Sequence, residues 1–140
     1  PENHVAQRSA LPVSAATGAR CRFNGRPTSV RRCESLEQAE VCTSDFLDLA
    51  RSLPALHRRL SERSSFGRTW ADAYGYLLLA TGRIDIMVDP KMAIWDIAPL
   101  YPIVEEAGGR ISDRTGARNP LGTNALAAVP GLHGELLTDS

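Results

Sequence analysis

The sequence predicts an α/β fold in which a mainly parallel sheet is flanked by helices. Through the second half of the chain, segments with helical spacing of apolar residues alternate with short strand-like runs. This alternation is typical of a mainly parallel sheet covered by helices. The 140 residues are 43% hydrophobic and 23% charged, an ordinary globular composition that supports one compact core.

The charge balance argues against nucleic acid and membranes as partners. Lys and Arg together number 16, as do Asp and Glu, so the formal net charge is zero and no broad basic field is expected. No apolar run reaches the roughly 20 residues of a membrane span. The cysteines Cys21, Cys33 and Cys42 lack the close spacing of a zinc site or a redox motif. We therefore expect a cytoplasmic protein with reduced thiols.

Turn and cap residues define the first elements. Asn24-Gly25 is a dipeptide preferred in two-residue hairpin turns, because both central residues need a positive φ. It predicts a hairpin across residues 21–30. Ser35, followed three residues later by Gln38, predicts a capping box and a short helix.

The next elements follow from apolar spacing and one proline. Residues 41–44 are typical of a brief strand. From Asp45 onward the leucines recur at helical spacing, and Pro54 is expected to end one helix and open another. Residues 61–67 are predicted to be a loop.

The second half supplies the alternation itself. A helix is predicted around residues 73–80, with Gly82 at its left-handed C-terminal position. Residues 83–89 alternate apolar and polar side chains, which predicts a strand. A helix at 97–107 follows, and Pro102 should kink its first turns. The remaining elements are a strand at 110–113, a loop at 114–123, a strand at 124–129 and a helix at 131–140.

Three aspartates and one arginine fall near strand ends and helix starts, where chemistry collects in such sheets. Asp89 ends a strand, and Asp96 follows Trp95 at the start of the next helix. Asp72 lies near the start of an apolar helix, and Arg68 lies in the segment before it. Each also has a structural interpretation, as a turn or cap residue for the aspartates and as an exposed charge for the arginine.

Two interpretations of Asp96 stay open from the residues alone. An Asp at a helix start commonly caps the helix by accepting backbone N–H bonds. Its oxygens can instead face a divalent cation such as Mg²⁺, which takes one or two carboxylates with water and substrate phosphate. The neighbouring Trp95 lies in an apolar stretch, and its loss should cost about 3–5 kcal/mol if the indole is buried.

The stretch WDIAPLYPIVEEAGG at 95–109 resembles the C-terminal signature of the inositol monophosphatase-like family of Mg²⁺-dependent phosphatases. Its Trp-Asp pair and its closing Glu-Ala-Gly-Gly both fit. The similarity extends back through ADAYGYLLLATGRIDIMVDPKM and, more weakly, to NGRPTSV, covering about residues 18–135. Within the family the text most resembles the bacterial histidinol-phosphate phosphatases.

The resemblance implies the C-terminal half of a layered sandwich with a mainly parallel sheet flanked by helices. Residues 1–45 would form a hairpin and strand segment that continues from a missing N-terminal half, including strands of that half's antiparallel sheet. Residues 46–140 would form a C-terminal α/β domain that selects the substrate. A homodimer is expected from the resemblance only.

Carried over by position, the resemblance assigns roles to four residues. Asp96 corresponds to the metal-ligand aspartate of the C-terminal domain, and Mg²⁺ is the implied cofactor. Asp89 corresponds to an acidic residue that contacts the non-phosphate part of the substrate. Asp72 stands where the histidinol-type enzymes carry an acid, which suits a cationic amine because an ammonium forms a charge-assisted bond. Arg68 matches an arginine of the histidinol-type pattern and is expected to contact the substrate.

The implied activity is hydrolysis of a small phosphorylated metabolite, with L-histidinol phosphate of histidine biosynthesis as the leading substrate. An inositol-1-phosphate or sugar-phosphate phosphatase is the alternative within the enzyme class. A non-catalytic remnant of the fold, kept for assembly or regulation, is the alternative outside it.

One departure from the family pattern limits this expectation. The family's other metal ligands come from a Glu and from an Asp-Pro-x-Asp-Gly-Thr motif, and the one Asp-Pro here, at Asp89, lacks the rest of that motif. We therefore expect no catalytic residue beyond the metal ligand Asp96, and a chain that is inert without the missing N-terminal half. The chain also begins with Pro1 rather than Met, which suggests part of a longer gene product.

Overall fold

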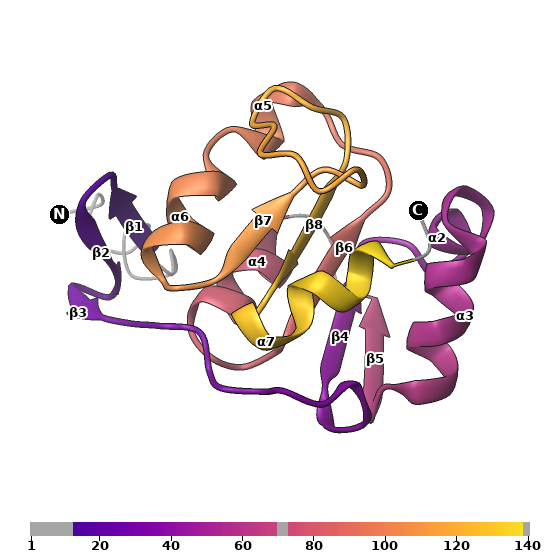
Figure 1. Cartoon of the computed structure of the whole chain (residues 1–140). Coiled ribbons are helices and arrows are strands. Elements are labelled where there is room, and N and C mark those ends of the chain that lie inside the picture. The colour runs from indigo at the N-terminus through magenta and orange to yellow at the C-terminus, as the bar shows by residue number, and fades with distance from the viewer. Residues whose placement is uncertain (1–12, 70–72, 139–140) are drawn as a thin grey trace, which may run out of the picture.

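A computed structural model describes residues 13–69 and 73–138 of the chain (Figure 1). These residues form a three-stranded sheet, a five-stranded sheet and the helices around them. The strands are β1 (Val13–Ala16), β2 (Ala19–Phe23), β3 (Arg26–Pro27), β4 (Glu40–Thr43), β5 (Phe66–Thr69), β6 (Ile86–Asp89), β7 (Arg110–Ser112) and β8 (Ala125–Ala128). The helices are α2 (Phe46–Ser52), α3 (Pro54–Arg63), α4 (Ala73–Ala80), α5 (Ile94–Ile97), α6 (Leu100–Glu106) and α7 (Pro130–His133), with the 3₁₀ turns η1 (Leu36–Gln38) and η2 (Gly134–Leu137).

The small sheet contains the predicted hairpin. β1, β2 and β3 pair antiparallel in that order. Asn24 and Gly25 turn the chain between β2 and β3 with φ values of 51° and 77°, so the Asn-Gly prediction is confirmed. Figure 1 shows this sheet at one end of the molecule beside α6, where Cys21 packs against Ala80 and Ala107.

The large sheet has the order β5-β4-β6-β8-β7. β4 pairs in parallel with β5 and β6, whereas β8 pairs antiparallel with β6 and β7. β4, β5, β6 and β7 therefore point the same way, and β8 runs against them. The predicted α/β fold with a mainly parallel sheet is confirmed, in the form of a mixed sheet.

The predicted division of the chain at residue 45 stays a prediction. β4 lies within segment 1–45, and it pairs with β5 and β6 of segment 46–140. The antiparallel strands β1 to β3 form a sheet of their own. The structure therefore places part of the first segment inside the large sheet.

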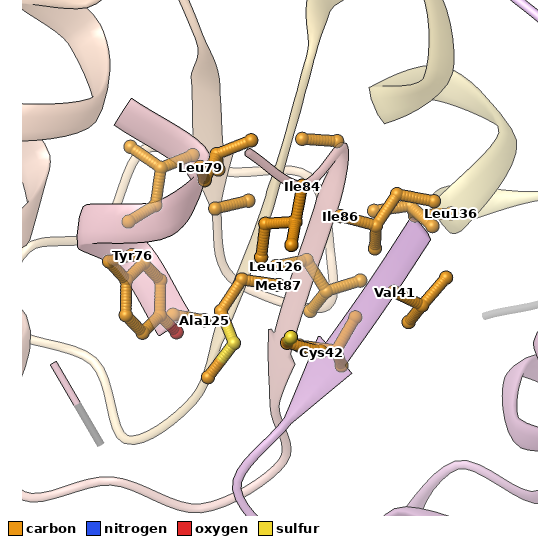
Figure 2. Close-up of a cluster of buried hydrophobic side chains, with 14 of the residues drawn as sticks. Val41, Cys42, Tyr76, Leu79, Ile84, Ile86, Met87, Ala125, Leu126 and Leu136 are labelled. Carbon is orange, nitrogen blue, oxygen red and sulfur yellow. The ribbon is translucent and has the colours of Figure 1, made fainter. Parts of the chain in front are cut away.

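Helices pack around the large sheet to close one main core. In Figure 1, α7 passes in front of the sheet, α4 lies behind it, and α2 and α3 stand beside β4 and β5. Figure 2 shows Tyr76 and Leu79 of α4 next to side chains of β6, β8 and β4. All four residues of β6 are buried. The predicted alternation across 83–89 therefore does not become an exposed polar face, because β6 is a central strand covered on both sides.

Asp85, just before β6, is a charged residue inside this core. Its side chain has no solvent exposure and accepts two bonds from the Arg31 guanidinium, 2.7 Å from Nε and 2.6 Å from Nη2. The Glu40 N–H donates to it as well, at 2.8 Å. A buried carboxylate is tolerated only when paired in this way, so Asp85 ties the segment after the hairpin to the start of β4.

Two local predictions in the first half are wrong. Ser35 makes no capping bond to η1. Its hydroxyl donates instead to the Glu37 carboxylate at 2.7 Å, so the capping box is absent and a single 3₁₀ turn forms. The predicted loop at 61–67 contains the end of α3 and the beginning of β5. β5 is an exposed edge strand, and exposed residues carry no apolar alternation that could reveal a strand.

The helix predicted at 97–107 is two helices. α5 begins at Ile94 and ends at Ile97, and α6 begins at Leu100. Pro102 is the third residue of α6, where the backbone N–H has no intrahelical partner in any case. The predicted kink at Pro102 is therefore replaced by a break at Ala98-Pro99.

Two further observations concern the cysteines and the length of the helices. Cys21, Cys33 and Cys42 are free thiols. No helix in the described part of the chain has both the length and the apolar character that a membrane crossing requires.

Candidate functional site

A cavity of about 460 Å³ lies where β4 and β6 end. Its walls come from the ends of these strands and from α4, α5 and α6. The carboxyl ends of adjacent parallel strands are the usual place for a site in an α/β sheet. Residues that carry polar groups into its lining are Ser44, Asp89, Lys91, Trp95 and Asp96.

Asp89 forms the buried side of this cavity. It is the last residue of β6 and is 1% exposed. The Ser44 N–H donates to its Oδ1 at 3.2 Å, because β4 and β6 run in parallel register and Ser44 follows the last paired residue of β4. The tertiary fold therefore holds this carboxylate at the cavity wall.

Tyr76 of α4 lies near the same carboxylate. Its side chain is fully buried. The pKa of its phenol is raised well above the usual value, first by burial and then by the charge of Asp89 and a hydrogen bond to it. The phenol therefore stays protonated, and its hydroxyl donates to Met92 Sδ at 3.5 Å.

Asp96 forms the open side of the cavity. It is exposed and lies in the first turn of α5. Ala93 occupies the N-cap position, and no side chain makes a capping bond there. The N-cap interpretation of Asp96 is therefore wrong, because the helix begins at Ile94, three residues earlier than predicted. Its carboxylate is available to the cavity.

Trp95 differs from its expected core role. The indole is 79% exposed and lines the same cavity. The cost of 3–5 kcal/mol argued for a buried indole does not apply to this side chain. The apolar residue of this turn that enters the core is Ile97, which has no exposure.

The donors present fit Mg²⁺ in kind but not in number. Mg²⁺ prefers hard oxygen ligands and uses one or two carboxylates together with water and phosphate. Asp96 offers one exposed carboxylate at the cavity. Among residues 13–69 and 73–138, no group of three His, Cys, Asp or Glu side chains is arranged to hold a metal ion. A Mg²⁺ ion held at Asp96 would therefore need water, phosphate or further protein ligands to complete its coordination.

Arg68 does not line this cavity, and Asp72 lies outside the described residues. Arg68 is exposed on β5, with its guanidinium carbon 4.7 Å from the centre of the Phe66 ring. It lines a different hollow of about 390 Å³, together with Tyr74 and Arg83. The residue that follows Asp72, Ala73, lines the cavity.

Sequence reasoning missed three residues of the site. Lys91 stands between Asp89 and Asp96 in the chain, so its place in the cavity had a local signal. Ser44 and Tyr76 had none, because each lies near Asp89 only through long-range packing.

Another hollow, of about 380 Å³, is mainly apolar. It lies between α3 and the region of η2 and is lined mainly by apolar side chains, including Leu53, Leu56 and Leu136. No carboxylate lines it. The cavity lined by Asp89 and Asp96 is therefore the better candidate for a functional site.

Residues 8–140 match the inositol monophosphatase family. The chain belongs to this family. The match covers more of the chain than the resemblance at 18–135, and it adds the strand β1.

Curated members of the family include two similar relatives. The histidinol-phosphatase of Mycobacterium tuberculosis is 35% identical over 113 residues, which are 79% of this chain and 43% of that protein. The histidinol-phosphatase of Chlorobaculum parvum is 32% identical over 130 residues, which are 82% of this chain and 49% of that protein. The chain therefore spans about half the length of the curated relatives that it matches.

Solved structures show the same fold. The extragenic suppressor protein suhB from Bartonella henselae superimposes with a TM-score of 0.81 at 25% sequence identity. That match covers 89% of this chain and 50% of the other. The mixed sheet and its helices are thus the inositol monophosphatase family fold over about half of its extent.

Proposed function

We propose that the chain is the C-terminal portion of a Mg²⁺-dependent phosphomonoesterase that hydrolyses L-histidinol phosphate to histidinol and phosphate. The observation that carries the proposal is the meeting of Asp89, Lys91 and Asp96 in one cavity. The similarity to proteins named histidinol-phosphatase supports the substrate. Histidine biosynthesis would be the setting of such a reaction.

Asp96 is the proposed metal ligand. Its exposed carboxylate lies in the lining of the cavity, and no capping bond occupies it. When bound, Mg²⁺ supplies polarisation of the phosphoryl group and activation of a water nucleophile. Lys91 also lines the cavity. Its positive charge would offset the negative charges of a bound phosphate and of the two carboxylates.

Asp89 is the proposed contact for the substrate amine. It lies on the buried side of the cavity, where a carboxylate interacts more strongly with an ammonium group than in water. A neutral polyol gains little from such a carboxylate. Asp72 and Arg68 stay predictions as substrate contacts, since neither is placed at the cavity by the described residues.

The complete site needs more protein than this chain contains. One carboxylate does not assemble a phosphatase metal site, and phosphate-monoester hydrolysis is among the slowest uncatalysed reactions. We propose that the missing ligands come from the other half of the protein. If instead the natural gene lacks an upstream Glu and an Asp-Pro-x-Asp-Gly-Thr motif, the non-catalytic alternative is favoured; its DNA sequence decides this.

Replacement of Asp96 tests the proposal directly. In the complete protein, Asp96→Asn should weaken Mg²⁺ binding and reduce turnover of L-histidinol phosphate to background, because an amide is a poor substitute for a hard anionic ligand. The melting temperature should change little, since the side chain is exposed. Phosphate release, calorimetric Mg²⁺ titration and thermal unfolding measure the three effects.

Glu62→Gln is the matched control, because it neutralises an exposed carboxylate on α3 that does not line the cavity. It should keep full activity. Unchanged turnover in Asp96→Asn would refute the ligand assignment. A wild-type preference for inositol-1-phosphate over L-histidinol phosphate would refute the substrate.

A further inference from the structure

Exposed apolar side chains gather on the open side of the cavity. Among residues 13–69 and 73–138, six large apolar or aromatic side chains are exposed, and three of them are Ile94, Trp95 and Leu121. Ile94 and Trp95 lie on α5, and Leu121 lies in the loop before β8. The Met92 N–H donates to the Thr123 carbonyl at 2.7 Å, and Figure 1 shows this loop and α5 together at one end of the molecule. We call these three side chains the α5 surface.

The loop that carries Leu121 is held in place by the rest of the fold. The Tyr101 hydroxyl accepts a bond from the Asn119 N–H at 2.9 Å. The Arg118 guanidinium pairs with the Glu105 carboxylate of α6 at 2.6 Å. Leu121 is 69% exposed on this anchored loop. A surface ordered in advance loses little conformational entropy when a partner covers it.

The composition of the α5 surface is typical of a binding surface. Apolar side chains exposed singly are ordinary, whereas several on adjoining segments mark a place where another surface packs. Trp95 is 79% exposed, and Trp is among the residues that most often dominate the binding energy of an interface. The α5 surface therefore favours a protein partner that buries the indole.

The position of Asp96 indicates which partner this is. Asp96 directly follows Trp95 in the first turn of α5. Mg²⁺–oxygen distances are about 2.1 Å, so two carboxylates on one ion bring oxygens within about 4 Å of each other. A segment that shares an ion with Asp96 therefore lies next to the Trp95 indole. The chain spans about half the length of the relatives that it matches, so a complete protein of that length has a second half to supply such a segment.

We infer that the α5 surface is where the other half of the protein packs, with the Trp95 indole as the apolar anchor beside the metal ligand Asp96. This inference rests on the proposed function, in which the other half supplies metal ligands. The packing segment places apolar side chains against Trp95 and Leu121 and directs carboxylates toward Asp96. Docking of the two halves and assembly of the metal site therefore depend on the same turn of helix.

Hydroxyl-radical footprinting of the complete protein, without Mg²⁺ or substrate, tests whether the α5 surface is covered. Trp95 and Leu121 should be oxidised about tenfold more slowly in the native than in the urea-unfolded protein, because the core of an interface is packed like a protein interior. Leu47 is the matched control, since it is 67% exposed on α2 and lies outside the α5 surface. Its oxidation rate should stay within about twofold of the unfolded rate, as for any singly exposed apolar residue. Equal protection of Trp95 and Leu47 would overturn the inference.

A photo-crosslink identifies the segment that covers the α5 surface. The photoreactive residue p-benzoyl-phenylalanine is placed at position 121 of the complete protein. The product should keep the mass of one chain on a denaturing gel and should join position 121 to a peptide outside these 140 residues. A product of twice that mass would identify a second copy as the partner. That result, a crosslink confined to the 140 residues, or no crosslink would each overturn the inference.

Trp95→Ala in the complete protein links the α5 surface to the metal site. It should lower the melting temperature and weaken Mg²⁺ binding about tenfold, the usual effect of losing an interface anchor, whereas Leu47→Ala should change neither. Retention of both properties in Trp95→Ala would contradict the inference. If the protein is inactive on L-histidinol phosphate but the α5 surface is protected and crosslinked as expected, the proposed function fails and the docking surface stands. If the protein is active and Trp95 is oxidised as fast as Leu47, the docking surface fails and the proposed function stands.

Discussion

Asp89 and Asp96 line the same cavity in different environments. Asp89 is buried and accepts a bond from the Ser44 N–H at the end of another strand, so its position depends on the sheet register. Asp96 is exposed in the first turn of a short helix. This difference agrees with the roles proposed for them, a substrate contact for Asp89 and a metal ligand for Asp96.

His133 carries a separate consequence for stability. It is 7% exposed, and its Nε2 lies 3.0 Å from the Ser112 hydroxyl oxygen. Burial lowers the pKa of the imidazole, and the charge of Arg110 lowers it further, against a backbone hydrogen bond to Leu126 that raises it. The folded chain therefore keeps His133 neutral at pH values where the unfolded chain already protonates it.

The sign of the pH effect follows from linkage. The unfolded histidine takes up a proton near pH 6.5, so stability should be complete above that pH and should fall as the pH drops below it. The slope is at most about 1.4 kcal/mol per pH unit for one proton. Chemical denaturation at several pH values between about 7.5 and 5, a range that spans the unfolded histidine pKa of about 6.5, measures this slope.

His133→Gln should flatten this pH dependence, because an amide does not titrate. His57→Gln is its control, since His57 lies half-buried on α3, with a 3.5 Å contact to Ser61 and an edge-on contact to the Phe46 ring. Retention of the full slope in His133→Gln would contradict the assignment.

The contact between α4 and β6 positions the buried half of the cavity. Gly75 of α4 faces Met87 of β6, and a Cβ there would lie 2.3 Å from Met87 Sδ. Met87 is fully buried, so a larger residue at position 75 would force its side chain to repack within the core. The absence of a side chain at Gly75 thus allows α4 to pack closely against β6.

Gly75→Ala should therefore destabilise the chain by about 1–3 kcal/mol through overpacking, although Ala is the better helix former. Thermal or chemical unfolding measures the loss. Gly134→Ala is the matched control, because a Cβ at that position meets nothing within 4 Å and its φ is −61°. Equal stability of the two variants would show that α4 and β6 are less tightly packed than described.

Elements with local signals were predictable, and elements defined by pairing were not. The Asp45 side chain accepts bonds from the Leu47 and Asp48 N–H groups and begins α2, and Pro54 begins α3, as cap and proline chemistry require. β5 is defined by its parallel pairing with β4. Such pairing depends on residues distant in sequence and leaves no periodic pattern in an exposed edge strand.

The chain as a unit forms one large sheet and one main core, and we propose that its cavity is completed by the other half of the protein. It spans 43% of the Mycobacterium tuberculosis relative and 49% of the Chlorobaculum parvum relative. The 140-residue chain alone should therefore release no phosphate from L-histidinol phosphate with Mg²⁺ above background. The complete protein, assayed in parallel, should be active. Turnover by the isolated chain would show that the metal site does not need the other half.

The sequence by itself determined the α/β class, the hairpin at Asn24-Gly25, the helices begun by Asp45 and Pro54, and the family. These depend on apolar periodicity, on φ and cap preferences and on an ordered motif, all of which are local or cumulative along the chain. Only the tertiary structure decided that Trp95 is exposed, that Asp96 does not cap its helix, and that the Ser44 N–H meets Asp89. Those facts depend on where a helix begins and on which strands and helices pack together, and they arise from contacts between residues that are far apart in the chain.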